Sequence, residues 1–468
     1  MEGAQAKPDI GQKPAVTQYD MMTKTPVPRL IIKLSIPAII SMLVTNIYNL
    51  VDTAFVGRFG NSASGAVGIV FGFMAIIQAV GFMFGQGSGS ILSRALGAKD
   101  HEKASVFASL GFFASFCVGL IITVVGFLWL DDIIMLLGST ETIAPYAKTY
   151  ITYILIAAPF MSSSLTLNNI LRYEGKAALG MVGLMTGAVL NMIGDPILMF
   201  ALDLKIAGAG LSTAISQIVS WLILLSMFLT GKTESKLSLK NTLRGRIVNV
   251  LNIMATGFPS LLRQALNSLS TIVLNAQCAV YGDAAIAAMS IVSRIVFFAF
   301  SIAIGVGQGF QPVSAFNYGA RKFRRLRKGY LFTVLASECI IAVGCTLLML
   351  FAGRLVGIFR DDAAVIEIGT RALRLQAAAQ LLLPLCMSTE MLFQSTGKRL
   401  GASFLSSLRS GLLFIPILLI LAKLRGLAGI QESQPLAQLL AVPIALPFAV
   451  WFFKKHPKED APDPTPEK

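Results

Sequence analysis

Residues 81–90 read GFMFGQGSGS, and 222 positions later residues 303–312 read AIGVGQGFQP, so that the triplet Gly-Gln-Gly recurs in register. The same offset aligns further pairs without a gap: Pro37 with Pro259, Gly97-Ala98 with Gly319-Ala320, and Gly175-Lys176 with Gly397-Lys398. Solenoid repeats have periods of roughly 20–50 residues, so this offset is far too long for one. It indicates duplication of a whole helical bundle, with a binding site between the copies.

The composition predicts that most of the chain faces lipid or other parts of the protein. Of the 468 residues, 55% are hydrophobic and 13% are charged, whereas a soluble domain carries about 25% charged residues. The fold class expected is an all-α integral membrane protein with twelve transmembrane helices in two pseudo-symmetric six-helix lobes. The spans are expected near 30–55, 64–89, 105–130, 143–169, 178–200, 208–230, 247–279, 285–312, 329–353, 364–392, 401–423 and 435–453.

The net charge of +15 has two possible readings, nucleic-acid binding and the positive-inside bias of short membrane loops. The basic residues cluster in the even-numbered connections, at 94–103, 172–176, 231–246, 321–328 and 398–399. Most acids outside the spans, such as Asp131 and Asp361, lie in the odd-numbered connections. This pattern excludes nucleic acid as a partner and places both termini and the even loops in the cytoplasm.

The domain organisation follows from these spans. We expect a polar cytoplasmic segment over 1–28 without signal-peptide features, a first lobe over 29–230 and a basic cytoplasmic linker over 231–246. A second lobe over 247–455 and a disordered cytoplasmic tail over 456–468 complete the chain. With six spans in each copy, the two lobes share one orientation in the membrane.

Several kinds of chemistry are not expected. All five cysteines lie in apolar segments without metal-ligand spacing, so no disulfide and no zinc site are predicted. Neither histidine, His101 nor His456, lies in a span, so protons inside the membrane must be carried by carboxylates. The glycine-rich run at 81–90 lacks the strand and the Lys-Ser/Thr ending of a phosphate loop. The chain is therefore predicted to be no enzyme, to bind no nucleotide and no cofactor, and to use ion gradients.

Two acids in the spans are the strongest candidates for an ion site. Asn46, Asn49 and Asp52 recur at three-residue spacing and form a polar stripe on one helix face. The alternative is that Asp52 only reaches water at the membrane interface. Asn191 and Asp195 are four residues apart on one face, and Pro196 removes a backbone donor next to them. The alternative here is a kinked helix with a capped polar pair.

Neighbouring spans could complete this site, Thr213 with a hydroxyl and Asn168 with an amide. Hard cations prefer oxygen ligands and a desolvated acid holds a proton more tightly, so Na⁺ and H⁺ both remain open. In the second half, Leu274 and Ile417 stand at the positions of Asp52 and Asp195, which confines the coupling site to the first lobe.

The second lobe carries its own intramembrane charges. Glu390 stands at the position of Asn168, and Arg294 lies in the eighth span. The two could neutralise one another, or Arg294 could pair with Glu338. Structural ion pairing and direct contact with substrate both remain open for these residues.

Taken together, the motifs resemble those of the multidrug and toxic compound extrusion (MATE) family, over nearly the whole chain and closest to its bacterial DinF/MepA-like branch. The residues that carry the resemblance are Pro37, Val51-Asp52-Thr-Ala-Phe-Val-Gly57, Gly85-Gln86-Gly87, Gly97-Ala98, Gly307-Gln308-Gly309-Phe-Gln311-Pro312 and Asn317-Tyr318-Gly319-Ala320.

The resemblance implies two lobes around a V-shaped cleft and export of organic, often cationic, compounds against inward proton or sodium flow. It also implies a set of cation- or proton-binding residues, namely Asp52, Tyr150, Asn168, Asn191, Asp195 and Thr213. Of these, Asp52, Asn191, Asp195 and Thr213 are the candidate Na⁺ ligands. Another branch of the family uses a glutamate on span seven, where this chain has Pro259-Ser-Leu-Leu-Arg263-Gln264. Polar candidates in the second lobe are Gln311, Arg294, Glu338 and Glu390.

The expected function is a cation-coupled multidrug efflux antiporter that works by alternating access. We expect it in the bacterial inner membrane, as a monomer, with drug-like small molecules and membrane lipid as its partners. The alternative is a flippase for lipid-linked oligosaccharides from the same superfamily. A flippase would need a basic central cavity, for which Arg263, Arg294 and Arg409 are the candidates.

Overall fold

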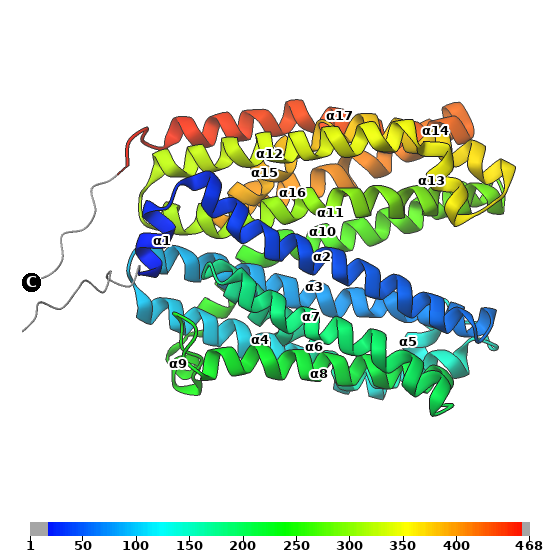
Figure 1. Cartoon of the computed structure of the whole chain (residues 1–468), viewed down its shortest axis with the longest axis horizontal. Helices are drawn as coiled ribbons and strands as arrows, with labels where there is room; N and C mark the ends of the chain where they lie inside the picture. The colour runs from blue at the N-terminus through cyan, green and yellow to red at the C-terminus, as the bar shows by residue number, and fades with distance from the viewer. Residues whose placement is uncertain (1–16, 461–468) are drawn as a thin grey trace, which may run out of the picture.

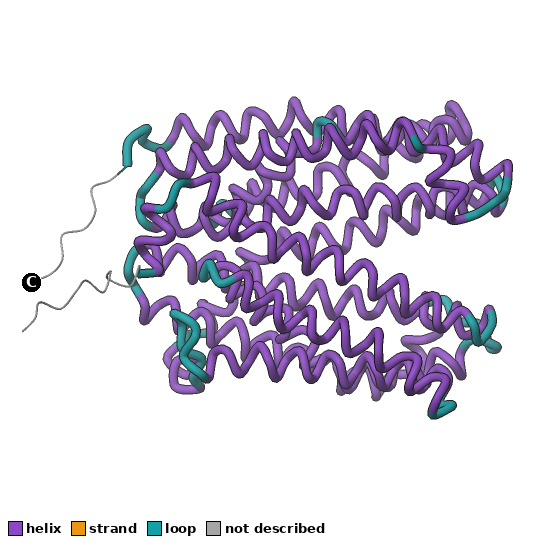
Figure 2. Tube along the Cα trace, in the orientation of Figure 1, coloured by secondary structure: helices purple, strands orange, loops and turns teal. Residues whose placement is uncertain are grey.

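The computed structural model describes residues 17–460, and all regular structure within them is helical (Figure 2). The first lobe comprises α2 (Val27–Gly57), α3 (Asn61–Gly97), α4 (His101–Leu128), α5 (Leu130–Leu136), α6 (Ala144–Tyr173), α7 (Ala177–Pro196), the π-helical turn η1 (Ile197–Ala201) and α8 (Lys205–Leu229). The second lobe comprises α10 (Ile247–Ala279), α11 (Asp283–Gly319), α12 (Phe323–Leu350), α13 (Ala352–Phe359), α14 (Ala363–Gln380), α15 (Leu383–Ser395), α16 (Arg399–Ser407), the π-helical turn η2 (Leu408–Leu413) and α17 (Phe414–Lys455). A short helix, α1 (Gln18–Lys24), precedes the first lobe, and α9 (Leu239–Arg244) lies in the linker between the lobes.

The two lobes lie side by side with their long helices roughly along one axis (Figure 1). Helix α1, helix α9 and the end of α17 all lie at one end of the bundle, which we call the near end. The other end, where α5 and α13 lie, is called the far end. Long apolar helices arranged along one axis are suited to crossing a bilayer.

Nine helical segments among residues 17–460 are long and apolar enough to span a membrane, so the number twelve stays a prediction. The expected span 364–392 is two helices, α14 and α15, which separate at Leu381-Leu382 just before Pro384. The break expected between 423 and 435 is confined to Gly426 (φ 61°, ψ −136°), where the two helices that make up α17 meet at a kink. That backbone conformation suits glycine, which has no Cβ to clash. The kink is sharp, since a Cβ on Gly429 would lie 2.0 Å from the carbonyl oxygen of Leu421.

Two arginines expected in basic loops lie inside helices. Arg94 belongs to the last turn of α3, and Arg172 belongs to the last turn of α6. Both helices continue several residues beyond the ends predicted for them, because their final turns are buried against the other lobe. Arg172 is only 5% exposed.

The repeated glycines bring the lobes into backbone contact. A Cβ added to Gly87 on α3 would lie 2.1 Å from the carbonyl oxygen of Ile253 on α10. At the equivalent position, a Cβ on Gly309 of α11 would lie 2.1 Å from the Ser35 hydroxyl on α2. The Gly-Gln-Gly triplet thus recurs because each copy packs against the first helix of the opposite lobe, where no side chain fits.

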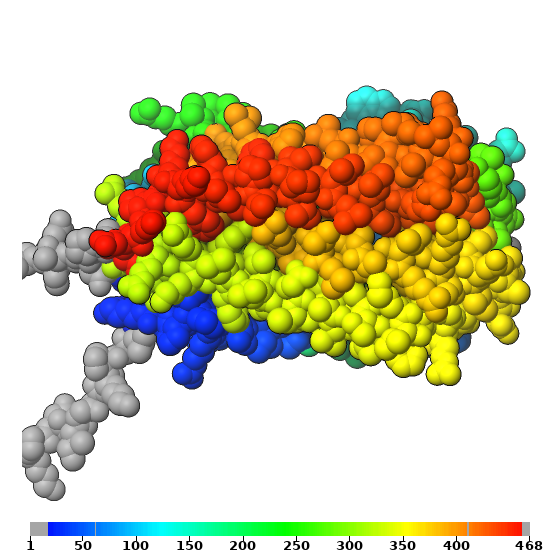
Figure 3. All heavy atoms as spheres, turned by 90° about the horizontal axis from the view of Figure 1, so that it is seen from above, coloured from blue at the N-terminus to red at the C-terminus, as the bar shows by residue number. Residues whose placement is uncertain are grey.

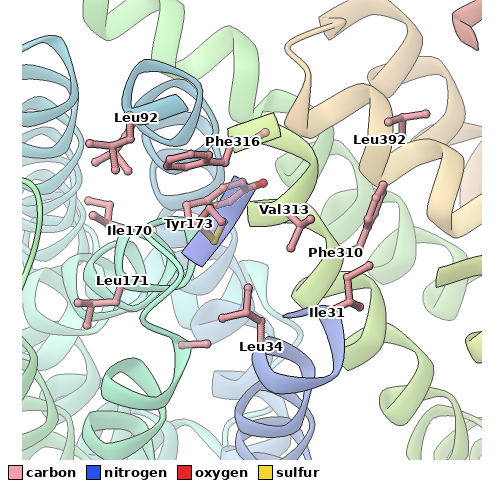
Figure 4. Packing of buried hydrophobic residues seen from close by; sticks show 14 of the residues in the cluster. Ile31, Leu34, Leu92, Ile170, Leu171, Tyr173, Phe310, Val313, Phe316 and Leu392 are labelled. Atoms are coloured by element: carbon pink, nitrogen blue, oxygen red, sulfur yellow. The ribbon is translucent and has the colours of Figure 1, made fainter. Parts of the chain in front are cut away.

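The near end of this interface is a shared hydrophobic core. Leu92, Ile170 and Tyr173 from the first lobe pack in one cluster with Phe310 and Phe316 from the second (Figure 4). The Ser90 hydroxyl lies 3.1 and 2.9 Å from the carbonyl oxygens of Gln394 and Ser395, and Arg94 donates to the carbonyl oxygen of Thr396 at 3.0 Å. We refer to these contacts as the near-end interlock.

The outer faces of the helices are apolar and exposed. In the view of Figure 3, α17 runs along the length of the molecule beside α12. Leu335, Val343 and Leu347 on α12 and Leu446 and Val450 on α17 are all exposed. An apolar surface of this extent on a single chain is that of a protein immersed in lipid.

The segments at the two ends of the chain are also placed against the bundle. Helix α1 lies within the polar segment expected over 1–28, and Asn317 and Arg325 of the second lobe donate to the carbonyl oxygen of Met22 at 3.2 and 3.3 Å. Residues 456–460 of the tail expected to be disordered pack on the second lobe, where the Arg324 amide donates to Asp460 at 2.6 Å. The remainder of these two predictions, over 1–16 and 461–468, lies outside the described residues.

Candidate functional site

A cavity of about 680 Å³ lies between the lobes. Helices α2, α3, α6, α7 and α8 line it from the first lobe, and α10, α11, α14, α15, η2 and α17 line it from the second. Gln86 and Glu390 belong to the wall, and the near-end interlock begins one helical turn beyond them at Ser90 and Gln394. The cavity is therefore bounded on the near-end side by the contact between the lobes.

Two carboxyl groups come together behind the first-lobe wall of this cavity. Asp52 on α2 and Asp195 on α7 are both buried, and their side chains lie close enough to interact directly. The cavity wall in front of them includes Asn191 and Thr213. The structure thus brings together two acids that are 143 positions apart in the sequence, and it separates them from the cavity by one layer of polar side chains.

Asn191 organises this layer. Its amide nitrogen lies 3.2 Å from the Asp195 carboxylate and 3.3 Å from the hydroxyl groups of Ser212 and Thr213 on α8. The Ser212 hydroxyl in turn donates to the backbone carbonyl oxygen of Asn191 at 3.2 Å. The four-residue spacing of Asn191 and Asp195 places both on the same face of α7, as predicted.

Several buried oxygen atoms in this cluster have no hydrogen-bond partner among the described residues. They are Oδ1 of Asp52, the hydroxyl of Tyr150, Oδ1 of Asn191 and Oδ2 of Asp195. Buried polar atoms are nearly always paired, and an exception calls for a specific explanation. A bound cation or an added proton would satisfy such a set, since both are held by oxygen atoms. We refer to Asp52, Tyr150, Asn191, Asp195, Ser212 and Thr213 as the acid cluster.

The other predicted first-lobe residues lie close by but in different roles. Asn46 and Asn49 line the cavity, so the polar stripe on α2 faces the interior. Asn168 also lines the cavity, beside Gly180 of α7, and it makes no hydrogen bond to either aspartate. Tyr150 is fully buried next to Asp52.

Neither of the two ion pairs considered for Arg294 is found among the described residues. Glu390 on α15 forms an ion pair with Arg263 on α10, across the helices that frame the cavity. Arg294 is exposed and forms no ion pair with either Glu390 or Glu338 among the residues described. Gln311 is buried in the cavity wall, within 3.5 Å of Arg172 and 3.4 Å of Gln394.

The positions equivalent to the acids are apolar in structure as well as in sequence. Leu274 lines the cavity at the place of Asp52, and Ile417 packs against the second-lobe core at the place of Asp195. The two lobes therefore present different chemistry to the same cavity.

Three residues of the site were missed from the sequence. Ser212 adjoins Thr213, and Tyr48 lies one helical turn before Asp52 and interacts with both aspartates, so helical spacing could have found each of them. Arg172 was assigned to a loop because it lies in a charged cluster at a predicted helix end. Instead it lines the cavity and donates to the side-chain oxygen atoms of Gln308 and Asn169.

Comparison with known proteins agrees with this architecture. The MatE family model matches residues 37–197 and again residues 259–420, one match in each half of the duplication. The multidrug export protein MepA of Staphylococcus aureus (strain N315) is 31% identical over 425 residues, which cover 90% of this chain and 93% of MepA. The MepA protein of Staphylococcus saprophyticus is 30% identical over 414 residues, covering 88% of this chain and 91% of that protein.

Solved structures give the same result for the fold. One described as the outward-facing conformation of a multidrug resistance MATE family transporter superposes with a TM-score of 0.89 at 25% identity. The match covers 94% of this chain and 98% of the other. The duplicated bundle, the cavity between its lobes and these matches lead to one assignment: the chain belongs to the multidrug and toxic compound extrusion family.

Proposed function

We propose that this protein is a cation-coupled multidrug efflux antiporter of the bacterial inner membrane, with both termini in the cytoplasm. The observation that carries the proposal is the acid cluster directly behind the wall of the inter-lobe cavity, in which one oxygen of each buried carboxyl group and two further oxygen atoms have no hydrogen-bond partner among the described residues. The relatives named as multidrug export proteins support the same function. The substrates are organic compounds, cations among them, and the coupling ion is H⁺ or Na⁺.

In this proposal the acid cluster senses the ion. Two adjacent buried carboxylates repel one another, so a proton or a sodium ion that neutralises one of them stabilises the arrangement in which they are close. Asn191 and Thr213 belong both to the cluster and to the cavity wall. Ion binding therefore changes the part of the cavity wall that a substrate touches. The coupling ion and the substrate each bind with different affinity to the inward-facing and outward-facing states, so binding of one alters the affinity for the other.

The near-end interlock provides the second element of alternating access. With the basic near end in the cytoplasm, the interlock closes the cavity on the cytoplasmic side, and the lobes must separate there to admit substrate. Gly87 and Gly309 allow the helices to approach closely in the closed state. The substrate is then released on the far side when the ion binds.

The proposal can be tested in everted membrane vesicles that are energised with a pH gradient or a sodium gradient. Gradient-driven movement of a fluorescent organic cation should be lost in Asp195→Asn. It should persist in Asp203→Asn, which makes the same chemical change at an exposed position outside the cluster. Export by Asp195→Asn at the wild-type rate would show that the coupling site lies elsewhere.

The flippase alternative is favoured by one observation, the presence of Arg263 and Arg409 in the cavity wall. Arg294, the third arginine on which it was based, is exposed and does not line the cavity. Proteoliposomes loaded with a fluorescent lipid-linked pyrophosphate sugar separate the two functions. Gradient-independent movement of that lipid between leaflets would favour the flippase.

A further inference from the structure

The charged side chains that line the cavity are unequal in sign. They are Arg172, Arg263, Arg409 and Glu390. Asp52 and Asp195 do not line the cavity, since Asn191 and Thr213 stand between them and its interior. The wall that meets a substrate therefore carries three cations and one carboxylate.

The single carboxylate in the cavity wall already has a partner within the protein. Glu390 forms an ion pair with Arg263, and it also lies near the guanidinium of Arg409. One carboxylate cannot compensate two guanidinium groups. Arg409 stacks on Phe300, with 5.5 Å from the guanidinium carbon to the ring centroid, and has no hydrogen bond or ion pair within the part of the chain that the structure describes.

Arg172 adds to the imbalance from the first lobe. Its guanidinium donates to the amide oxygens of Gln308 and Asn169 and lies 3.5 Å from that of Gln311, all of them neutral groups. These amide oxygens accept hydrogen bonds from the guanidinium but leave its charge uncompensated, and its buried Nε has no hydrogen-bond partner among the described residues. A charge held away from water needs a counter-charge, and where the protein supplies none, the site favours an anion.

The surroundings of Arg409 define the rest of the ligand. Phe297, Phe300, Met387 and Met391 line the same cavity on the second-lobe side. Aromatic and thioether side chains adapt to apolar bodies of different shapes. The planar fork of a guanidinium matches a carboxylate, sulfonate or phosphate with two parallel hydrogen bonds.

We propose that the cavity takes amphipathic organic anions, whose oxyanion group binds Arg409 while the apolar body packs on Phe300 and its neighbours. This inference names a substrate class and rests on the proposed export function only for its transport step. Arg172 contributes positive potential, and its terminal nitrogen atoms already donate to the amide groups of Gln308 and Asn169, so Arg409 is the anchoring residue. The cavity thus serves anions as well as cations, and the acid cluster is reserved for the coupling ion.

The test is a binding measurement on the purified full-length protein in detergent, which needs no ion gradient. The probes are a dansyl-labelled fatty carboxylate and the same molecule ending in a neutral amide, followed by dansyl fluorescence. We expect the wild type to bind the carboxylate at least ~10-fold more tightly than the amide, as one charge-assisted pair of hydrogen bonds allows.

Arg409→Gln should remove that preference by weakening carboxylate binding about 10-fold, while amide binding changes less than about 2-fold. Arg409→Lys should keep part of the preference because it keeps the charge, and it shows that the position tolerates substitution. Arg354→Gln, an exposed arginine of the same lobe outside the cavity, should bind both probes like the wild type. Equal binding of the two probes to the wild type, or equal weakening of both in Arg409→Gln, would overturn the proposal.

The two proposals fail in different ways. If Arg409→Gln loses carboxylate binding while gradient-driven export does not depend on Asp195, the proposed substrate class is supported and the proposed ion site is wrong. If Asp195→Asn abolishes export and the carboxylate preference is missing from the wild type, the ion site stands and the substrate class is wrong.

Discussion

The first lobe buries two carboxyl groups beside one another, whereas the second lobe buries one carboxylate between two arginines. Asp52 and Asp195 each have one oxygen atom with no hydrogen-bond partner in the part of the chain that the structure describes, and Glu390 is paired with Arg263. Opposite charges balance each other within the protein, but adjacent like charges are balanced only by something that binds. This difference underlies the two proposals made above, a mobile cation at the first-lobe site and an anionic ligand at the second-lobe site.

The backbone of the two lobes, in contrast, follows one plan. Gly87 and Gly309 meet the opposite lobe in equivalent places, and so do Gly97 and Gly319, each with a Cβ position 2.1 Å from a backbone oxygen of the partner helix. The duplication therefore preserved the surfaces on which the lobes pack against one another. What diverged is the set of side chains that line the cavity or lie directly behind its wall.

The strongest contrast between the lobes should be in transport, which is lost on substitution of an acid in the first lobe and not on removal of the ion pair in the second. Asp52→Asn should reduce gradient-driven export to the level of vesicles without the protein, because the acid cluster can then no longer bind and release its ion. The double variant Arg263→Gln/Glu390→Gln removes the ion pair of the second lobe and should retain export that depends on the gradient. Initial rates of dye transport in everted vesicles measure both. Loss of gradient dependence in the double variant would assign coupling to the second lobe as well.

The next prediction concerns what the lobes share. Gly87→Ala and Gly309→Ala should each lower stability by about 3 kcal/mol, the upper part of the range for overpacking, because the added methyl group meets the opposite lobe. Gly68→Ala is the control, since a Cβ there meets nothing within 4 Å. Thermal unfolding in detergent, followed by tryptophan fluorescence, gives the ranking. A harmless Gly309→Ala beside a damaging Gly87→Ala would mean that the interface is asymmetric.

A third and smaller effect concerns protein stability, which should respond differently to substitution in the Arg263–Glu390 ion pair and in the acid cluster. Glu390→Gln should cost about 2 kcal/mol, because it leaves a partly buried Arg263 unpaired, and the exposed fraction of Arg263 reduces the full penalty. Asp195→Asn should be neutral or stabilising, because it removes one of two adjacent carboxylates. Melting temperatures of both variants and of Arg263→Gln/Glu390→Gln measure these changes in stability. A strongly destabilised Asp195→Asn would indicate that the acid cluster is structural.

The sequence was informative where residues of the site share one helix. Asn191 and Asp195, four residues apart, must lie on one face of α7, and Asn46 and Asn49 must face the same side of α2. The duplication was visible because identical glycines recur at two pairs of places where the lobes touch, Gly87 with Gly309 and Gly97 with Gly319. The family resemblance then supplied Tyr150 and strengthened Thr213, which no spacing rule could connect to Asp52.

The sequence was uninformative where a partner lies on another helix. Glu390 pairs with Arg263, 127 positions away, because α10 and α15 flank one cavity, and no local pattern distinguishes that pairing from one with Arg294. Arg172 looked like a loop residue, since a charge after an apolar run ordinarily marks a helix end. Burial of the last turn of α6 against α11 depends on the packing of the lobes, which the local sequence does not encode.

The weakest contrast between the lobes is expected in the pH dependence of stability, at two equivalent turns at the near end. Gly175 and Gly397 both adopt a positive φ (80° and 77°), but the residue before them is Glu174 in the first lobe and Thr396 in the second. Glu174 is buried and accepts hydrogen bonds from the backbone amides of Glu234 and Ser235 in the linker, at 3.1 and 3.0 Å. The first turn is thus fixed to the linker by a titratable group.

Burial raises the pKa of Glu174 to about 7, against the opposing effect of its hydrogen bonds from Ser235. Because the pKa in the folded protein lies above the unfolded value of 4.5, the folded state favours the protonated carboxyl group. The contribution of Glu174 to the free energy of unfolding is therefore fully present below pH 4.5 and is lost as the pH rises through 7. The melting temperature of the wild type should therefore fall, relative to that of Glu174→Gln, by a few degrees between pH 5 and pH 8, about 1–2 kcal/mol. Thr396→Val, at the turn without an acid, should follow the wild-type pH profile. A pH-independent difference between the wild type and Glu174→Gln would show that the carboxylate is held ionised by its linker donors throughout.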